Sequence, residues 1–214
     1  MLAFEHSFWK EHPGAVLAGV DEVGRGPLAG PVYASAVVIA SADADSYLDG
    51  PLSGLTDSKK LTAAARSRFC SVLMELPGVR IGLGSASVEE IDDLNILRAT
   101  HLAMRRAILD LGSPQPVHAL VDGLPPKGLP VPSTAIVKGD AKSLLIAAAS
   151  VVAKVRRDAL MVEMDALYPG YGFASNAGYG TKAHLDALRT LGPCPIHRRT
   201  FAPVADIIAP TLGL

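Results

Sequence analysis

An apolar run near the N-terminus ends in two adjacent carboxylates. Residues 15–20 are Ala-Val-Leu-Ala-Gly-Val, and Asp21 and Glu22 follow at once, before the glycine-rich segment 24–31. A short apolar run bounded by turn residues is typical of a buried strand, which predicts a first strand over residues 15–21. Unpaired charge at the edge of a core is costly, and a bound cation would neutralise it. The pair therefore predicts a divalent-metal site beside a backbone that a ligand approaches closely.

The rest of the chain alternates between β-type runs and helical periodicity. Further strands are predicted over residues 31–40, 79–86, 117–121 and 133–137, and the first two strands are predicted to form an antiparallel hairpin. Helices are predicted over residues 62–76, 87–110 with a break, 142–166 and 181–190. This order predicts an α/β fold with a mixed five-stranded sheet flanked by helices. We expect a catalytic domain over residues 1–165 and, packed on it, a helical C-terminal extension over residues 166–214.

Two later strands also end in carboxylates. Asp122 follows the fourth predicted strand and Asp140 follows the fifth, each beside a glycine. An aspartate at such a position is often only a turn residue or a helix cap. If these strand ends lie beside Asp21 and Glu22, however, four carboxylates converge, and such a set suits Mg²⁺ or Mn²⁺. Two such ions, about 3.5–4 Å apart, stabilise the attacking and leaving oxygens of phosphoryl displacement.

Two other functional classes are compatible with parts of this pattern. Residues 24–29, Gly-Arg-Gly-Pro-Leu-Ala, match the dinucleotide-binding pattern GxGxxA, which would indicate an oxidoreductase. That function requires a helix in this segment, whereas Pro27 and Pro31 bracket it and a β-type run follows. A nucleic-acid-binding module without catalysis is the second alternative. The metal-dependent nuclease is favoured over both because acids end three of the predicted strands.

The net charge limits how a nucleic acid could bind. The 214 residues carry a formal net charge of -1, so such a partner must be held by a local basic patch. Lys138 and Lys142 flank Asp140 and are predicted to contact phosphate groups. Other late basic residues are predicted to lie on solvated helix faces, namely Arg156, Arg157 and Arg189. The run 146–153 is predicted to be pure core.

The remaining features indicate no further site. Cys70 and Cys194 are far apart in the sequence and lack a CxxC context, so neither a disulfide framework nor a thiolate zinc site is expected. The six histidines show no metal-ligand spacing. The N-terminus does not have the pattern of a signal peptide, and no segment has the length and apolarity of a membrane span. We therefore expect a cytoplasmic monomer.

Six segments, taken in order, resemble the motifs of bacterial ribonuclease HII. The first is Val-Asp-Glu-Val-Gly-Arg-Gly-Pro-Leu-Ala-Gly-Pro-Val at residues 20–32. The others cover residues 57–61, 120–123, 138–143, 146–155 with Arg157-Asp158, and 178–181. Together they span nearly the whole chain. The resemblance implies an RNase H-like fold with a helical C-terminal region.

The same resemblance implies a substrate and a reaction. It implies metal-dependent cleavage of RNA in RNA–DNA hybrids, and incision on the 5′ side of a single ribonucleotide embedded in duplex DNA, as in ribonucleotide excision repair. It implies that one set of carboxylates is catalytic and holds Mn²⁺ or Mg²⁺: Asp21, Glu22, Asp122 and Asp140. These expectations agree with the acidic strand ends, which the residue pattern had already indicated.

The resemblance also implies substrate contacts. Gly24, Arg25 and Gly26 would read the ribose 2′-hydroxyl, the group that distinguishes RNA from DNA at a given site. Tyr179 would stack near the sugar that follows the ribonucleotide. The chain departs from the family pattern at residues 176–177, where Asn-Ala replaces a common His-Lys and removes a possible phosphate contact. Lys182 is the residue expected to compensate, and we find no clear clamp-binding motif after Phe201.

Overall fold

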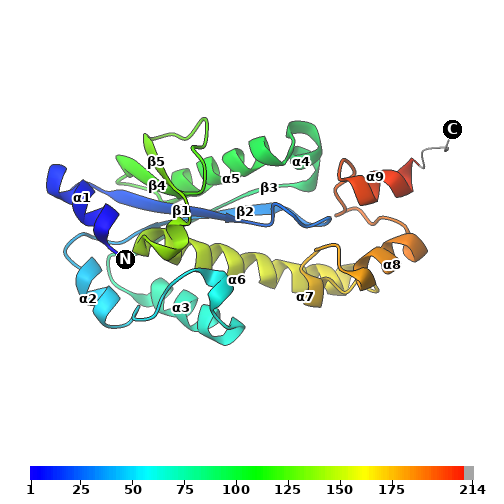
Figure 1. Cartoon of the computed structure of the whole chain (residues 1–214), viewed down its shortest axis with the longest axis horizontal. Coiled ribbons are helices and arrows are strands. Elements are labelled where there is room, and N and C mark those ends of the chain that lie inside the picture. Colours follow the sequence, from blue (N-terminus) through cyan, green and yellow to red (C-terminus); the bar gives the residue numbers. More distant parts are fainter. Residues whose placement is uncertain (210–214) are drawn as a thin grey trace.

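A five-stranded mixed sheet forms the centre of the protein (Figure 1). The computed structural model describes residues 1–209, so the last five residues of the expected extension, 210–214, lie outside the described residues. The strand order is β3-β2-β1-β4-β5, in which β1 pairs antiparallel with β2 and parallel with β4. The strands are β1 (Leu17–Val23), β2 (Val32–Val38), β3 (Arg80–Ala86), β4 (His118–Asp122) and β5 (Ser133–Ile136). The predicted mixed sheet and its first hairpin are confirmed.

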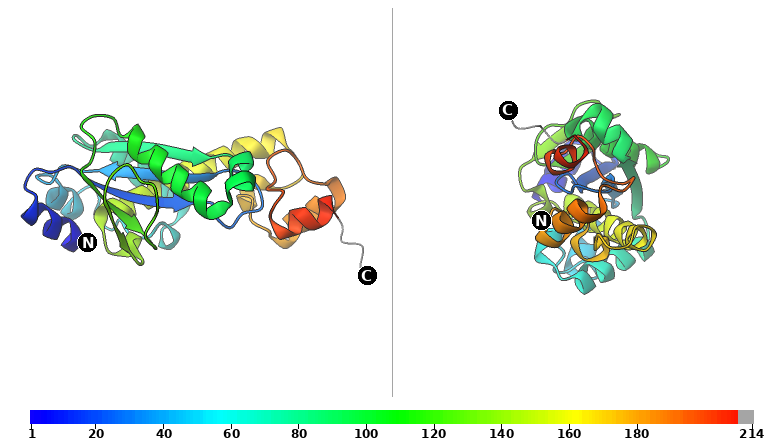
Figure 2. Two further views of the ribbon diagram at one scale, coloured as in Figure 1. Left: turned by 90° about the horizontal axis from the view of Figure 1, so that it is seen from above. Right: turned by 90° about the vertical axis from the view of Figure 1, so that its right-hand side faces the viewer.

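Helices cover both faces of the sheet. Figure 2 shows, in its end view, α5 on one side and α6 with α3 on the other. The helices of the α5 side are α4 (Val88–Leu94) and α5 (Ile96–Asp110), and those of the α6 side include α2 (Ala44–Asp49), α3 (Ala63–Glu75) and α6 (Leu144–Leu167). Each face has its own buried apolar cluster, one built on Leu17 and Leu120 and the other on Val20 and Val121.

Helix α6 packs very closely on β1. A side-chain carbon at Gly19 would collide with the backbone of Leu145, so glycine permits the close approach. The small residues of α6 are buried, as its sequence predicts. The expectation of pure core is wrong at Ser150, however, because its hydroxyl donates to Ser58 Oγ at 2.9 Å and also acts on Asp21, whose pKa it lowers. One turn of α6 therefore faces the acidic strand ends.

The sequence pattern missed two N-terminal helices, α1 (Ala3–Glu11) and α2. In α1 the apolar pattern is interrupted because Glu5 is buried at a core-facing position. Its carboxylate accepts hydrogen bonds from Ser143 Oγ at 2.6 Å and Leu145 N at 3.2 Å. Glu5 thereby satisfies a donor at the start of α6, where helical N–H groups have no intrahelical partner.

The predicted break in the 87–110 helix is confirmed at Asn95. This residue has a positive φ of 69°, and its side chain accepts from the backbone N–H groups of Leu97 and Arg98. Asn95 therefore ends α4 and caps α5. Among residues 1–209, none of the helices combines the length and the hydropathy that crossing a bilayer requires.

Three helices follow α6 at the end of the molecule opposite α1 (Figure 1). They are α7 (Phe173–Asn176), α8 (Lys182–Leu191) and α9 (Ala202–Ile208). The expected helix over residues 181–190 is α8, whereas no individual helix was predicted at the position of α9. These helices pack beside the loop between β1 and β2, and Leu28 N donates to Gly178 O at 2.8 Å.

Candidate metal centre

Asp21 and Asp122 lie side by side at the same level of the sheet. Strands β1 and β4 are parallel, and Val20 pairs with Val121, which brings the next residue of each strand together. The strand β1 continues to Val23, two residues beyond its predicted end, because the hairpin with β2 extends that far. Both aspartates alternate with the residues of the α5 face, so their side chains lie on the α6 face.

Asp140 joins them from a short 3-10 turn after β5, η2 (Gly139–Ala141). The turn is tied to β4 because Gly139 N donates to Asp122 Oδ1 at 2.6 Å. One carboxylate oxygen each from Asp21, Asp122 and Asp140 lies within 4.8 Å of the others. Three carboxylates at this spacing form a donor set of hard oxygens, which fits Mg²⁺ or Mn²⁺.

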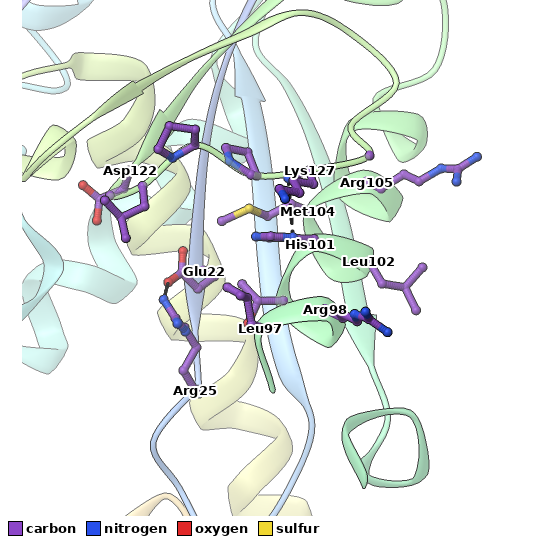
Figure 3. A pocket seen from close by; sticks show the side chains of 16 residues that line it. Glu22, Arg25, Leu97, Arg98, His101, Leu102, Met104, Arg105, Asp122 and Lys127 are labelled. Carbon is purple, nitrogen blue, oxygen red and sulfur yellow. Dashed lines mark hydrogen bonds and ion pairs between the residues drawn. The ribbon is translucent and has the colours of Figure 1, made fainter. Parts of the chain in front are cut away.

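Glu22 approaches the same place from the other face of β1. Successive strand residues point to opposite faces, so Glu22 is separated from Asp21 and is not part of the three-aspartate cluster. Figure 3 shows its carboxylate below Asp122, with Arg25 beside it. The Arg25 guanidinium lies 3.4 Å from Glu22 Oε1. The four carboxylates therefore gather at one edge of the sheet, as predicted. The three aspartates form one cluster, however, and Glu22 lies apart from them on the other face of β1.

Burial and mutual repulsion make the ionised carboxylates costly. Burial, followed by the charges of Glu22 and Asp122, holds the pKa of Asp21 well above its ordinary value. The pKa of Asp140 is raised by burial and by Asp122, and that of Glu22 is raised by burial although Arg25 opposes the shift. A divalent cation among these groups would remove the repulsion, so the electrostatics also fit a metal site.

Replacing Asp21 with asparagine is expected to stabilise the metal-free protein at neutral pH. A raised pKa means that the folded state disfavours the ionised form, so stability is lost as the pH rises from the unfolded-state pKa through the folded-state pKa. Asparagine carries no charge, and its oxygen can still accept from Glu22 N, a bond of 2.7 Å. Thermal melts in a chelator should show a midpoint higher by a few degrees, the effect of about 1–2 kcal/mol in a chain of this size.

The control for this stabilisation is to repeat the thermal melts of both proteins at lower pH. The gain from Asp21→Asn should shrink as the pH falls, because the wild-type carboxyl then becomes neutral as well. A variant that melts below the wild type at neutral pH in chelator would contradict the proposed repulsion.

The segment 57–60, for which no role was predicted, also reaches the acidic cluster. It contains the 3-10 turn η1 (Ser58–Lys60), which Asp57 caps through Lys59 N at 2.9 Å. Asp57 and Lys59 both act on Asp140, the first raising and the second lowering its pKa. The fixed Ser58–Ser150 contact holds η1 beside α6, which places a lysine at the edge of the cluster. The sequence motif Asp-Ser-Lys-Lys at residues 57–60 could have indicated this contact with the acidic cluster.

Two buried arginines hold the loop 24–31 through hydrogen bonds to its backbone. Arg157 is fully buried and donates to the carbonyl oxygens of Ala29, Pro31 and Ala177, at distances of 2.9–3.1 Å. The expectation that it lies on a solvated helix face is therefore wrong. A side chain at Gly24, where φ is 92°, would collide with the Arg157 guanidinium. Arg157 thus requires glycine at this position of the loop.

Arg198 is the second of these arginines and was not predicted as a functional residue. It is fully buried, and its guanidinium donates to the carbonyl oxygens of Gly24, Arg25 and Gly30. Burial, together with the charge of Arg157, lowers its pKa to about 9, so it remains a cation at neutral pH. The two guanidinium groups fix the loop through its backbone and leave the Arg25 side chain exposed.

Tyr179 lies against this loop, as a substrate-contact role requires. Its side chain is 43% exposed, and a side-chain carbon at Gly26 would lie 3.6 Å from the Tyr179 ring. Asn176 is buried and bonds to Tyr171 O and Gly178 N, at 2.8 and 2.7 Å. The residue that replaces the common histidine therefore shapes the turn before Tyr179.

The predicted lysine contacts are more peripheral. Lys138 and Lys142 are exposed beside η2, and Lys142 Nζ donates to Val137 O at 2.7 Å. Lys182, expected to compensate for the missing lysine, is exposed and forms an ion pair with Asp186 at 2.7 Å. None of the three contacts the aspartate cluster, so any phosphate contact from them would occur at the rim.

A groove of about 700 Å³ opens beside Glu22 and Asp122 (Figure 3). Its far wall is α5, from which His101 faces Lys127 of the loop that follows β4. The groove combines an acidic edge with several basic side chains: Arg25, Arg98, Arg105 and Lys127. Such a surface can hold a polyanion next to the carboxylates.

The loop after β1 does not have the form that dinucleotide binding requires. No helix begins after Gly26, and the chain enters β2 instead. The oxidoreductase alternative is therefore excluded by the local fold.

Known ribonucleases match this chain over most of its length. The family model for ribonuclease HII matches residues 18–204. The ribonuclease HII of Rhodospirillum rubrum is 58% identical over 198 residues, which cover 92% of this chain and 88% of that protein. The crystal structure of the ribonuclease H2 from Pyrococcus horikoshii OT3 has a TM-score of 0.71 and 28% identity, and the match covers 90% of this chain and 96% of that chain.

A more distant structure shares the fold alone. The crystal structure of Bst-RNase HIII in complex with Mn²⁺ has a TM-score of 0.69 at 18% identity, covering 92% of this chain and 70% of that chain. These likenesses confirm the RNase H-like fold. The chain belongs to the ribonuclease HII family and is therefore a metal-dependent type 2 ribonuclease H, an endoribonuclease that acts on RNA–DNA hybrids.

Proposed function

We propose that this protein also incises duplex DNA on the 5′ side of a single embedded ribonucleotide, leaving a 3′-hydroxyl and a 5′-phosphate. The observation that carries the proposal is the contact between three parts of one surface. Asp122 of the carboxylate cluster lines the basic groove together with Glu22 and Arg25, and Gly26 of the loop 24–31 faces the exposed ring of Tyr179. A phosphate at the cluster would have its neighbouring sugars beside the loop and the ring.

The catalytic residues in this proposal are Asp21, Glu22, Asp122 and Asp140. Two Mg²⁺ or Mn²⁺ ions, when bound, would supply an activated water and charge stabilisation at the departing 3′ oxygen. Asp21, Asp122 and Asp140 would hold an ion on the α6 face, and Glu22 would extend the site towards the groove. The carboxylates do not move far, because strand pairing and the Gly139–Asp122 bond fix them.

Recognition of the ribose is assigned to Gly24, Arg25 and Gly26. The carbonyl oxygens of Gly24 and Arg25 already accept hydrogen bonds from Arg198, so recognition falls to the outward-facing groups of the loop. A loop held rigid in this way loses little entropy on binding, which favours discrimination by one hydroxyl group. Lys138 and Lys142 would contact phosphates at the rim of the same surface.

A cleavage assay tests the proposal directly. A labelled DNA duplex with one ribonucleotide should be cut at its 5′ side with Mg²⁺ or Mn²⁺, and the cut should stop when a chelator removes the metal. The control is the same duplex made entirely of DNA, which should stay intact. Cleavage of both duplexes, or of neither while an RNA–DNA hybrid is cut, would contradict the embedded-ribonucleotide function.

Replacing Tyr179 with alanine should weaken cleavage at a single ribonucleotide by about 10- to 100-fold. The ring is exposed, so its loss removes a stacking surface worth about 1–3 kcal/mol while leaving the core intact. Kinetics on the single-ribonucleotide duplex give the measurement, with Tyr179→Phe as the control that keeps the ring. An unchanged rate for Tyr179→Ala would remove this residue from the substrate site.

A further inference from the structure

A buried pair of histidines lies directly beneath Tyr179. His184, in the first turn of α8, and His197, in the segment before α9, are 0% and 1% exposed. Their Nε2 atoms are 3.0 Å apart, and His184 Nδ1 lies 2.9 Å from the carbonyl oxygen of Tyr179. We call these two residues the imidazole pair. Neither belongs to the metal centre, and neither contacts the loop 24–31 through its ring.

Hydrogen-bond chemistry determines where each proton of the imidazole pair must be. A carbonyl oxygen only accepts, so His184 Nδ1 must carry the proton that it shares with Tyr179 O. If His184 is neutral, its Nε2 is an acceptor, and His197 Nε2 must be the donor across the pair. His197 Nδ1 is then an acceptor, and it lies 3.0 Å from the donor Cys194 N. One tautomer of each ring satisfies these contacts, and the Cys194 carbonyl oxygen, 3.3 Å from His197 Nδ1, then receives no proton from the ring.

The surroundings keep both rings neutral. Tyr171 and Phe173 pack against the imidazole pair, with ring centroids 5.0–6.3 Å away, and the Cys194 thiol lies 3.1 Å from His197 Nδ1. Burial lowers the pKa of His184, and burial with the neighbouring His184 lowers the pKa of His197 to about 4. At neutral pH the chain of donors therefore runs in one direction, from Cys194 to the carbonyl of Tyr179.

The backbone at Tyr179 determines where its ring points. The Tyr179 side chain is 43% exposed and otherwise rests on the loop at Gly26, so the position of its backbone decides where on that loop the ring lies. Its peptide groups are held on both sides, because Tyr179 N donates to Asn176 O at 2.9 Å and Leu28 N donates to Gly178 O at 2.8 Å. The Tyr179 carbonyl accepts from Thr181 N at 2.8 Å and from His184 Nδ1 at 2.9 Å, and these two bonds complete the frame from the side of α8.

We propose that the imidazole pair positions Tyr179 for the junction between the ribonucleotide and the following deoxynucleotide, with Cys194 setting the direction of the hydrogen bonds. His184 and His197 are then positioning residues that act through Tyr179 and do not touch the substrate. The inference rests on the proposed function of Tyr179 as a substrate contact. It adds a chain of neutral side chains, from residue 194 to residue 179, on which that contact depends.

The tautomers can be tested without any activity measurement. Long-range ¹H–¹⁵N correlation spectra of the full-length protein at neutral pH should show His184 protonated only at Nδ1 and His197 only at Nε2. The exposed His6 serves as the internal reference for a histidine outside the pair. A charged ring in the pair, or His184 protonated at Nε2, would overturn the inference.

The kinetic test uses two amides that place the donor differently. An asparagine amide nitrogen at residue 184 can replace Nδ1 and donate to the Tyr179 carbonyl, whereas a glutamine amide reaches the Nε2 position instead. On the single-ribonucleotide duplex, His184→Gln should lose about 10-fold or more in kcat/KM, because small misplacements of a contact group are costly. His184→Asn should retain most of the wild-type value even if its melting temperature falls.

A double variant separates positioning from general damage. In a Tyr179→Ala background, His184→Gln should have little further effect, because residues that act as one unit are not additive. An additive loss would overturn the inference, as would wild-type kinetics of His184→Gln while Tyr179→Ala is impaired. If Tyr179→Ala cleaves the single-ribonucleotide duplex at the wild-type rate, the proposed role of Tyr179 fails. That result differs from both results that would overturn the inference about the imidazole pair.

Discussion

Replacing Asp122 with asparagine is expected to lower the cleavage rate by about 1,000-fold or more while leaving the fold intact. Metal ions contribute several kcal/mol of charge stabilisation, and about 4 kcal/mol corresponds to this factor. One carboxylate oxygen of Asp122 lies within 4.8 Å of an oxygen of Asp21 and of Asp140, and Asp122 lines the same groove as Glu22. The substitution removes one negative charge and one of the oxygens available to a cation.

The fold should survive because asparagine can keep the structural contact of Asp122. Its side-chain oxygen can accept from Gly139 N, the bond that holds the turn η2 in place. Circular dichroism should therefore match the wild type and the melting temperature should not fall, while steady-state cleavage of an RNA–DNA hybrid collapses. Asp93→Asn is the matched control, since Asp93 is an exposed carboxylate on α4. Cleavage near the wild-type rate in Asp122→Asn would refute its place in the metal centre.

The second large effect is expected for stability, in Arg198→Met. Methionine fills part of the space but donates no hydrogen bond, so the carbonyl oxygens of Gly24, Arg25 and Gly30 lose their partner. Each unsatisfied buried group costs about 1–3 kcal/mol, and relaxation recovers part of the sum. We expect the free energy of unfolding to fall by about 3–5 kcal/mol, as when a buried charged partner is removed.

Urea unfolding measures this loss, and the next residue supplies the control. Arg199 is exposed, so Arg199→Met should change the free energy of unfolding by no more than about 0.5 kcal/mol. Equal effects of the two substitutions would show that the buried hydrogen bonds of Arg198 contribute little. The comparison is made within one segment, so differences in local backbone structure cancel.

The sheet and the carboxylates were predictable because both depend on local patterns. Each strand has an apolar run, and Asp21, Asp122 and Asp140 come at or just after the ends of such runs. Parallel pairing then brings Asp21 and Asp122 to the same level. Successive residues of a strand point to opposite faces, so the position of Glu22 on the face opposite Asp21 was also predictable in principle. That prediction depends on β1 continuing beyond Asp21, which the sequence pattern did not indicate.

The buried arginines could not be predicted from the same patterns. An arginine in a charged stretch of a helix is usually solvated, and nothing near Arg157 in the sequence indicates its partners Ala29 and Pro31. Those partners are backbone carbonyl groups more than 100 residues away, so no opposite charge marks the interaction. The imidazole pair was not predicted for a similar reason, because the spacing of 13 residues between its two histidines matches no metal-ligand motif. Helix α1 was missed because its buried Glu5 breaks the apolar pattern.

The span of the Arg198 hydrogen bonds has a consequence for the growing polypeptide. The aspartates come from the first 140 residues, whereas the loop that begins at Gly24 needs a guanidinium from a residue 174 positions later. Contacts of such wide sequence separation form late, since domains emerge from the ribosome starting at the N-terminus. During synthesis the acidic residues therefore leave the ribosome long before the loop beside them can adopt its final conformation. The loop at Gly24 can be fixed only after Arg198 has been made, so a turn formed early in synthesis depends on a side chain that appears much later.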